Sequence, residues 1–323
     1  MRSSIGSRTA ACSSSTASAA QAPATSCSTG TTPRTGRWTR VHDRLLDGEG
    51  QRNPYWQATV DSKGRLHLAW TWRRTGDVRT NHDVSYARSI DGSGVEWERS
   101  DGRRYAMPVT RADAELLAAV PENSNLINQT SIAVDEEDQP VIATYWSDGQ
   151  ARSGVKRPVQ YRIIEQAPEG HCNDGRTPAG WCIDDTGFLS RTSFELGGFG
   201  TLAIPISRPQ VLAQGSGANR VVHLVFRAQE RGQKVSIATR RGLGAAWDPP
   251  IDLTHDSVED WEPSYDTEQW RRTRVLDLYV QRVNQVNNEG IASTAPQRVY
   301  VLSYPLASAR PTTIEEPQLD GTE

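Results

Sequence analysis

The chain has 323 residues, of which 36% are hydrophobic, and its formal net charge is −3. This length is compatible with two domains or with one large all-β domain, so the repeats must decide between them. The charge balance provides no basic footprint for nucleic acid, and no apolar stretch approaches the roughly 20 residues that span a bilayer. We therefore expect neither nucleic acid nor a membrane as a partner.

Residues 1–34 differ in composition from the rest of the chain. They are rich in Ser, Thr, Ala and Gly, show no strand pattern, and lack the apolar core of a signal peptide. We predict that this segment is disordered or that it is a frame-shifted start. The second hypothesis arises because permitted codons for residues 3–33, read in another frame, encode a strand, turn and strand. The coding DNA distinguishes the two.

Four similar units follow the N-terminal segment. Each has a polar or aromatic lead-in and two alternating strands separated by a polar turn, and another alternating strand comes after it. The units are residues 53–70, 128–145, 208–226 and 262–280, and the strands that follow them are 84–88, 159–163, 235–239 and 299–303.

Such repeated units are typical of the blades of a β-propeller, with a β-sandwich as the alternative. We assign residues 35–306 to the propeller and residues 307–323 to a C-terminal tail. A short helix is expected only within residues 111–120. His67 and His223 lie inside alternating strands and are expected to be structural.

Two Gly-rich turns that end in tryptophan support this architecture, at residues 92–97 and 242–247. They resemble the Asp-box pattern Ser-x-Asp-x-Gly-x-x-Trp. Ser89 and Asp91 match its first two fixed positions, and Gly94 lies one residue further along the chain than the pattern requires. An Asp-box is a structural turn between outer strands. It therefore indicates the fold and not the activity.

Cys172 and Cys182 flank a loop rich in Gly and Pro. In an exported protein this spacing favours a disulfide, whereas a metal site would need more ligands than His171 and the two thiols. No short loop has the density of carboxylates that a strong calcium site requires. We predict a disulfide, no metal and no other cofactor.

Six segments taken together resemble BNR-repeat proteins of the sialidase-like β-propeller superfamily. They are residues 53–57, 80–89, 124–130, 204–210, 226–231 and 261–270. The resemblance implies an exported, extracellular propeller of seven blades. Because only four units are recognised, the ring is expected to be incomplete at its N-terminal side.

Some BNR-repeat proteins are polysaccharide lyases, and this chain is most similar to the L-rhamnose-α-1,4-D-glucuronate lyase type. The resemblance thus implies a monomeric enzyme that cleaves an acidic, uronic-acid-containing polysaccharide by β-elimination. That reaction needs a cation to neutralise the uronate carboxylate, a base for the proton on C5, and an acid for the leaving oxygen.

The candidates for proton transfer are one histidine and two tyrosines. His82 lies between Asn81 and Asp83. Histidine is the usual side chain for proton transfer near neutral pH, and Asp83 or another carboxylate can tune it. Tyr145 and Tyr265 are candidate phenolic acids. The alternatives are a histidine that is exposed or caps a strand, and tyrosines packed between blades.

Arginines at strand ends are the candidates for binding the carboxylate, namely Arg208, Arg227 and Arg231. Each has an alternative role as a surface charge. Buried amides also satisfy backbone groups, so their assignment to sugar hydroxyls has a structural alternative. The further candidates for substrate contact are Asn81, Asn125, Asn128, Gln129, Trp261 and Glu262.

Two other functions stay open. Glu262 and Asp266 are two carboxylates suited to acid and base roles in a sialidase-like glycoside hydrolase. A propeller that binds carbohydrate without catalysis is the third possibility. Elimination leaves an unsaturated uronate and hydrolysis leaves a new reducing end, so product analysis separates the three.

Overall fold

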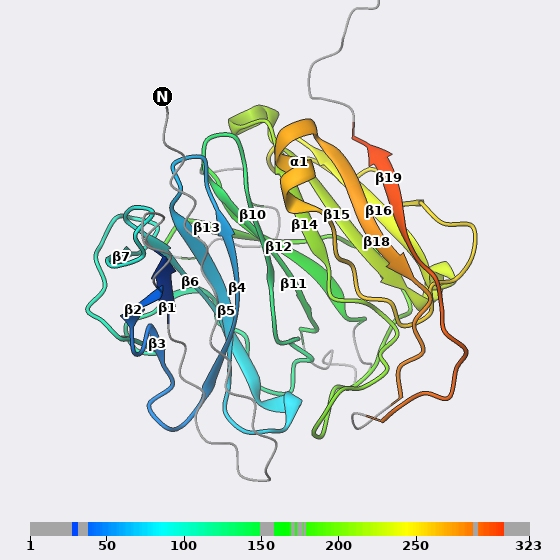
Figure 1. The fold of residues 1–323 in the computed structure, drawn as a ribbon, viewed down its shortest axis with the longest axis horizontal. Helices are drawn as coiled ribbons and strands as arrows, with labels where there is room; N and C mark the ends of the chain where they lie inside the picture. The colour runs from blue at the N-terminus through cyan, green and yellow to red at the C-terminus, as the bar shows by residue number, and fades with distance from the viewer. Residues whose placement is uncertain are drawn as a thin grey trace, which may run out of the picture.

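The computed structural model describes residues 28–31, 38–148, 158–168, 172, 177, 179–286 and 290–306. The fold consists almost entirely of antiparallel sheets that lie side by side (Figure 1). The α-helix in these residues is α1 (Thr267–Thr273), and no helix among them is long and apolar enough to cross a bilayer. Short 3-10 turns are η1 (Val78–Thr80), η2 (Gly217–Asn219) and η3 (Gln229–Arg231).

Three sheets have strands in chain order. The first contains β4 (Asn53–Val60), β5 (Leu66–Arg73), β6 (Asn81–Ser89) and β7 (Trp97–Glu98), with β9 (Glu115–Ala118) also paired to β6. The second contains β10 (Ser131–Val134), β11 (Pro140–Trp146), β12 (Gln160–Gln166) and β13 (Trp181–Asp185). The third contains β14 (Gln210–Gln214), β15 (Val221–Ala228), β16 (Lys234–Arg241) and β17 (Ile251–Asp252).

Three smaller sheets complete the described part. They are β18 (Val275–Gln281) with β19 (Val299–Pro305), β1 (Ser28–Thr31) with β2 (Trp38–His42), and the parallel pair β3 (Leu46–Asp47) with β8 (Val109–Thr110). Strand β1 lies inside the segment 1–34, for which no strand was expected. The other residues of that segment, and the tail 307–323, lie outside the described residues.

The first strands β4, β10 and β14 lie beside one another in that order, so the three sheets spread from a common line as blades do. The expected all-β class is confirmed. The strands described here close no ring, and the number of seven blades stays a prediction. The Gly-rich turns at residues 92–97 and 242–247 connect third and fourth strands, as the Asp-box resemblance predicted.

The helix expected within residues 111–120 is wrong, because Glu115–Ala118 pairs with the edge of β6 as strand β9. The helix α1 lies elsewhere. It begins after Asp266, whose carboxylate accepts hydrogen bonds from the backbone N–H groups of Glu268 and Gln269.

The strands are buried on both faces because alternate residues enter different hydrophobic layers. On β5, Ala69 packs toward the second sheet with Ile142, while Trp70 packs on the opposite side with Leu46. On β15, Val225 and Phe226 divide in the same way between two layers. This explains why every residue of β5 and β15 is buried.

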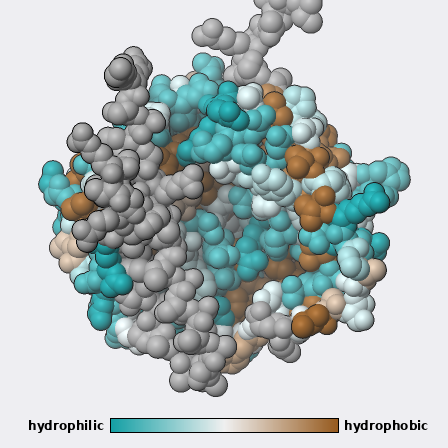
Figure 2. Space-filling model, viewed as in Figure 1, coloured by the Kyte–Doolittle hydropathy of each residue, from teal (hydrophilic) through white to brown (hydrophobic). Residues whose placement is uncertain are grey.

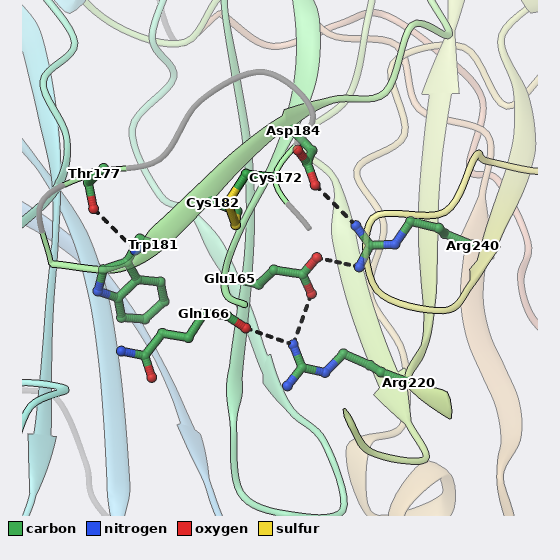
Figure 3. Close-up of a disulfide and its surroundings, with 9 residues drawn as sticks. All are labelled: Glu165, Gln166, Cys172, Thr177, Trp181, Cys182, Asp184, Arg220 and Arg240. Atoms are coloured by element: carbon green, nitrogen blue, oxygen red, sulfur yellow. Dashed lines mark hydrogen bonds and ion pairs between the residues drawn. A yellow bond between two sulfur atoms is a disulfide. The ribbon is translucent and has the colours of Figure 1, made fainter. Parts of the chain in front are cut away.

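A buried ionic cluster joins the second and third sheets (Figure 3). The carboxylate of Glu165 on β12 accepts a 3.0 Å hydrogen bond from Arg220 and another from Arg240. Arg220 also pairs with Asp135 at 2.8 Å, and Arg240 lies 3.6 Å from Asp184. Each buried charge therefore has a partner of opposite sign.

The disulfide between Cys172 and Cys182 lies beside this cluster, with its Cα atoms 5.2 Å apart. Cys182 lies on β13 directly opposite Glu165 on β12. The bond closes the loop between these two outer strands, as its spacing predicted.

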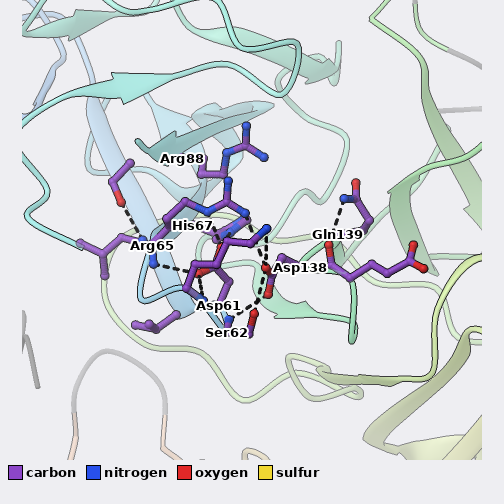
Figure 4. A network of polar contacts seen from close by, with 12 residues as sticks. Asp61, Ser62, Arg65, His67, Arg88, Asp138 and Gln139 are labelled. Atoms are coloured by element: carbon purple, nitrogen blue, oxygen red, sulfur yellow. Dashed lines mark hydrogen bonds and ion pairs between the residues drawn. The ribbon is translucent and has the colours of Figure 1, made fainter. Parts of the chain in front are cut away.

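A second polar network begins at the turn between β4 and β5 (Figure 4). Asp61 accepts hydrogen bonds from the backbone of Lys63 and Arg65, and its Oδ2 lies 3.1 Å from Nε2 of the fully buried His67. The other ring nitrogen of His67 contacts the Tyr86 hydroxyl at 2.7 Å. Burial lowers the pKa of His67, which is consistent with the structural role expected for it.

Hydrophilic residues gather around the centre of the face shown in Figure 2, and apolar residues form separate small patches.

Candidate active site

A cavity of about 330 Å³ opens where the repeated units converge. We call it the axial cavity, because every one of the four repeated units contributes to its lining. The polar residues of this lining are Tyr55, Arg73, Asn128, Thr201, Arg208, Arg227, Asp260, Glu262 and Gln285. Four of the residues predicted from the sequence meet here, namely Asn128, Arg208, Arg227 and Glu262.

Glu262 is the central carboxylate of the lining. Its Oε2 accepts a 2.8 Å hydrogen bond from the backbone N–H of Arg208, and its Oε1 lies 3.6 Å from Nη1 of Arg208 and 3.8 Å from Nη2 of Arg227. Burial raises the pKa of Glu262, although both guanidinium groups act in the opposite direction. The side chain is still 39% exposed, so the carboxylate has access to the cavity.

Arg227 braces the wall of the cavity. Its side chain is 1% exposed, and it donates hydrogen bonds to the carbonyl groups of Trp261 (2.9 Å) and Ile204 (3.0 Å) and to the side chain of Gln233 (2.9 Å). Most of its hydrogen-bonding capacity is therefore used by the protein itself.

Tyr145 is buried beside the lining. Its ring packs edge-on against Tyr161 and Phe194, and burial raises the pKa of its hydroxyl well above the ordinary value, with Arg208 and Glu262 close enough to affect it. Within the described part of the chain the hydroxyl has no hydrogen-bond partner. A buried polar group without a partner is uncommon and often marks a functional position.

His82 is not among the residues that line the axial cavity. It lies on β6, and its Nδ1 is 2.9 Å from Oδ2 of Asp83. Asp83 in turn accepts a 2.7 Å hydrogen bond from Arg111. The structure therefore places His82 in a separate ionic group.

Two of the predicted amides serve the backbone, which is the alternative left open above. Asn81 is buried and donates to the carbonyl of Leu126 at 2.8 Å. Asn125 donates to the carbonyl of Phe194 and accepts from the N–H of Leu196, so it holds the segment that forms one side of the cavity. Gln129 is exposed and lies outside the lining.

Three other predicted residues also lie away from the cavity lining. Arg231 pairs with Asp252 at 2.6 Å and braces β16 against β17. Trp261 is buried in a hydrophobic layer and donates to the carbonyl of Tyr279, so its ring has no free face for a sugar. Tyr265 lines a second cavity of about 580 Å³ near Val60, at the opposite end of β4 from Tyr55, and burial raises its pKa to about 12.

The hydrolase hypothesis paired Glu262 with Asp266, and the structure separates them. Asp266 is the N-cap of α1, and its carboxylate is occupied by backbone N–H groups. Asp260 lines the axial cavity instead.

Tyr55, Arg73 and Asp260 line the cavity but were not predicted from the sequence. Tyr55 lies within one of the segments that carry the family resemblance. Arg73 ends β5 much as Arg227 lies near the end of β15, and this shared position in two units was an available signal.

Comparison with known proteins supports the repeat assignment. Residues 29–171 match the model of a family described as BNR repeat-containing. The resemblance found in the sequence is thus confirmed over this stretch. No curated protein sequence matches the chain.

The fold is similar to those of two solved polysaccharide lyase structures. One is the polysaccharide lyase Uly1, with a TM-score of 0.55 and 12% identity over 88% of this chain and 53% of that chain. The other is a PL25 ulvan lyase bound to -[GlcA(1-4)Rha3S]-, with a TM-score of 0.54 and 12% identity over 88% and 59% of the two chains. This chain spans less than two thirds of either structure, and at this identity the similarity establishes the fold.

The fold thus places guanidinium groups and a carboxyl group of raised pKa around one cavity, with the unpartnered phenol of Tyr145 buried beside it. Such a set can bind an anion and transfer a proton. Within the described ranges, no three His, Cys, Asp or Glu side chains are grouped to hold a metal ion.

Proposed function

We propose that this chain is a carbohydrate-active enzyme that cleaves a uronic-acid-containing polysaccharide by β-elimination. The observation that carries the proposal is the convergence of three arginines and Glu262 on the axial cavity from three separate parts of the chain, namely the end of β5, the hairpin of β14 and β15, and the segment before β18. The similarity to polysaccharide lyase structures supports it through the fold. A monomeric, extracellular enzyme acting on a rhamnose–glucuronate glycan is the form of the proposal that the family resemblance favours.

The chemistry assigns a role to each group. Guanidinium groups neutralise the uronate carboxylate, which makes the proton on C5 more acidic. Glu262 takes that proton, because a raised pKa makes its carboxylate a stronger base. As the C5–H and C4–O bonds break, the C4–C5 double bond forms and Tyr145 gives a proton to the leaving oxygen.

The test is an assay of the purified chain on a rhamnose–glucuronate polysaccharide, followed by the ultraviolet absorbance of the unsaturated uronate. Glu262→Gln and Tyr145→Phe should each lower the rate by about 10²-fold or more. Glu96→Gln is the matched control, because Glu96 is an exposed carboxylate paired with Arg104 on the surface. His82→Ala tests the location of the site, since loss of turnover in this variant would contradict a site in the axial cavity.

One observation favours a second candidate, a glycoside hydrolase. Asp260 and Glu262 both line the cavity, and the charge of Asp260 contributes to the raised pKa of Glu262. Two carboxyl groups, one acting as acid and the other as base or nucleophile, are the machinery of glycoside hydrolysis. New reducing ends without the unsaturated product would establish this candidate over the lyase.

A further inference from the structure

Arg73 is a buried cation that faces the axial cavity. It ends β5, is 8% exposed and belongs to the lining. Its Nη1 donates to the Tyr55 hydroxyl at 3.3 Å, its Nη2 donates to the carbonyl of Gly76, and its Nε has no partner among the described residues. Its guanidinium carbon lies 5.4 Å from the centre of the Tyr55 ring.

The other two arginines of the lining differ from Arg73 in their charge balance. Arg208 is 3.6 Å from Glu262, and Arg227 is 3.8 Å from the same carboxylate. Across the described ranges, no carboxylate forms an ion pair with Arg73; the acceptors that contact it are the neutral oxygens of Tyr55 and Gly76. Arg73 is thus the lining guanidinium that lacks a counterion.

A buried charge without a counterion is unfavourable, because the protein replaces only part of the hydration that the charge loses. An anion that enters the cavity restores this balance. A carboxylate suits the position, because a guanidinium binds it through parallel N–H groups, and the contacts with Tyr55 and Gly76 use one N–H of each Nη group of Arg73. Tyr55 orients the guanidinium through two contacts, one with the face of its ring and one with its hydroxyl.

We propose that Arg73 is the residue that binds the carboxylate of an acidic sugar, with Tyr55 as its positioning residue. This inference takes its class of ligand from the proposed function, but it does not depend on the proposed reaction. The anion site then lies at a residue that was not predicted from the sequence, and Arg227 is a brace of the cavity wall.

The experiment is calorimetric titration of the full chain with a glucuronate-containing oligosaccharide, with the same oligosaccharide after reduction of its carboxyl groups, and with inorganic sulfate. Arg73→Gln should weaken binding of the acidic oligosaccharide on the order of 10- to 100-fold, the loss expected for a charged hydrogen bond. Binding of the carboxyl-reduced oligosaccharide should not change. Arg73→Lys should retain part of the affinity, and Tyr55→Phe should lose less affinity than Arg73→Gln.

Arg162→Gln is the matched control, because Arg162 is also buried but pairs with Asp148 at 2.7 Å and lies outside the axial cavity. It should bind both oligosaccharides as the wild type does and melt at a lower temperature. Arg73→Gln should melt no lower than the wild type, because it removes a charge that has no counterion.

Three outcomes would overturn the proposal. They are unchanged binding of the acidic oligosaccharide by Arg73→Gln, an equal loss for the carboxyl-reduced oligosaccharide, and Arg73-dependent binding of sulfate without binding of glucuronate. Failure of the lyase proposal is distinguishable, because Arg73-dependent binding without an unsaturated product refutes the reaction and leaves the anion site intact.

Discussion

Replacing Glu165 by glutamine tests the buried cluster that joins the second and third sheets. Glu165 is 1% exposed and accepts hydrogen bonds from Arg220 and Arg240, whose side chains are almost completely buried. Glutamine keeps the shape but removes the charge, so both arginines lose a counterion. Arg220 keeps its 2.8 Å contact with Asp135, whereas Arg240 keeps only the 3.6 Å contact with Asp184.

The expected loss follows from these contacts. A hydrogen bond to a charged group contributes roughly 1.5–3 kcal/mol, and removing one partner of a buried ion pair costs about 3–5 kcal/mol. Because Arg220 keeps a second carboxylate, the cost of losing Glu165 is smaller for Arg220 than for Arg240, and the costs of the two contacts do not add in full. We therefore expect Glu165→Gln to lower the free energy of unfolding by about 3–5 kcal/mol.

Urea unfolding followed by tryptophan fluorescence measures this change. The control is Glu96→Gln, which removes the same charge from an exposed pair with Arg104 and should change the free energy of unfolding by less than about 1 kcal/mol. Equal losses in the two variants would refute the reasoning, because burial would then have no effect on the strength of the ion pair.

Three further predictions follow from the site and the disulfide. Because burial raises the pKa of Glu262 above its ordinary 4.5, the folded protein loses stability as the pH rises from the unfolded pKa through the folded one. Glu262→Gln should therefore melt above the wild type at neutral pH and close to it in acid, and the opposite order in a pH series of melting curves would contradict this. Tyr145→Phe should unfold at the same urea concentration as the wild type or a higher one, because it removes a buried hydroxyl without a partner; a loss above about 1 kcal/mol would show that the hydroxyl is bonded in the folded state. Replacing Cys172 and Cys182 by serine should cost about 3 kcal/mol for a loop of this length, and reduction of the wild type should reproduce the loss, whereas a reduced wild type of unchanged stability would count against it.

The sequence predicted the fold class because local patterns determine it. Three signals act over a few residues each: the alternation of apolar and polar residues, the polar turns and the spacing of the repeats. The second strand of each repeated unit, the Asp-box turns and the disulfide therefore lie where they were expected. The helix at residues 111–120 was wrong for a related reason. Its residues have no local signal for pairing with the distant edge of β6, and that pairing made part of them strand β9.

The candidate site was likewise predictable in part, where local sequence position determines it. Asn128, Arg208 and Glu262 were identifiable because each begins its own repeat, and Arg227 lies at the same end of the repeat that Arg208 begins. Repeats arranged around a common line bring such positions together. What each side chain does there depends on its partners in three dimensions. The sequence could not show that Arg227 is occupied by carbonyl groups, that Trp261 is buried in a hydrophobic layer, or that Tyr265 lies near the opposite end of β4.

The sequence by itself thus determined that the chain forms repeated β-sheets and which ends of the repeats carry polar side chains. Only the tertiary structure decided which charges are paired. Arg73 and Arg208 are indistinguishable as arginines at strand ends, but Glu262 comes from another blade and lies within ion-pair distance of Arg208 and Arg227 and not of Arg73. The physical reason is that pairing depends on distances of a few ångströms between segments far apart in the chain, and packing of the blades sets those distances.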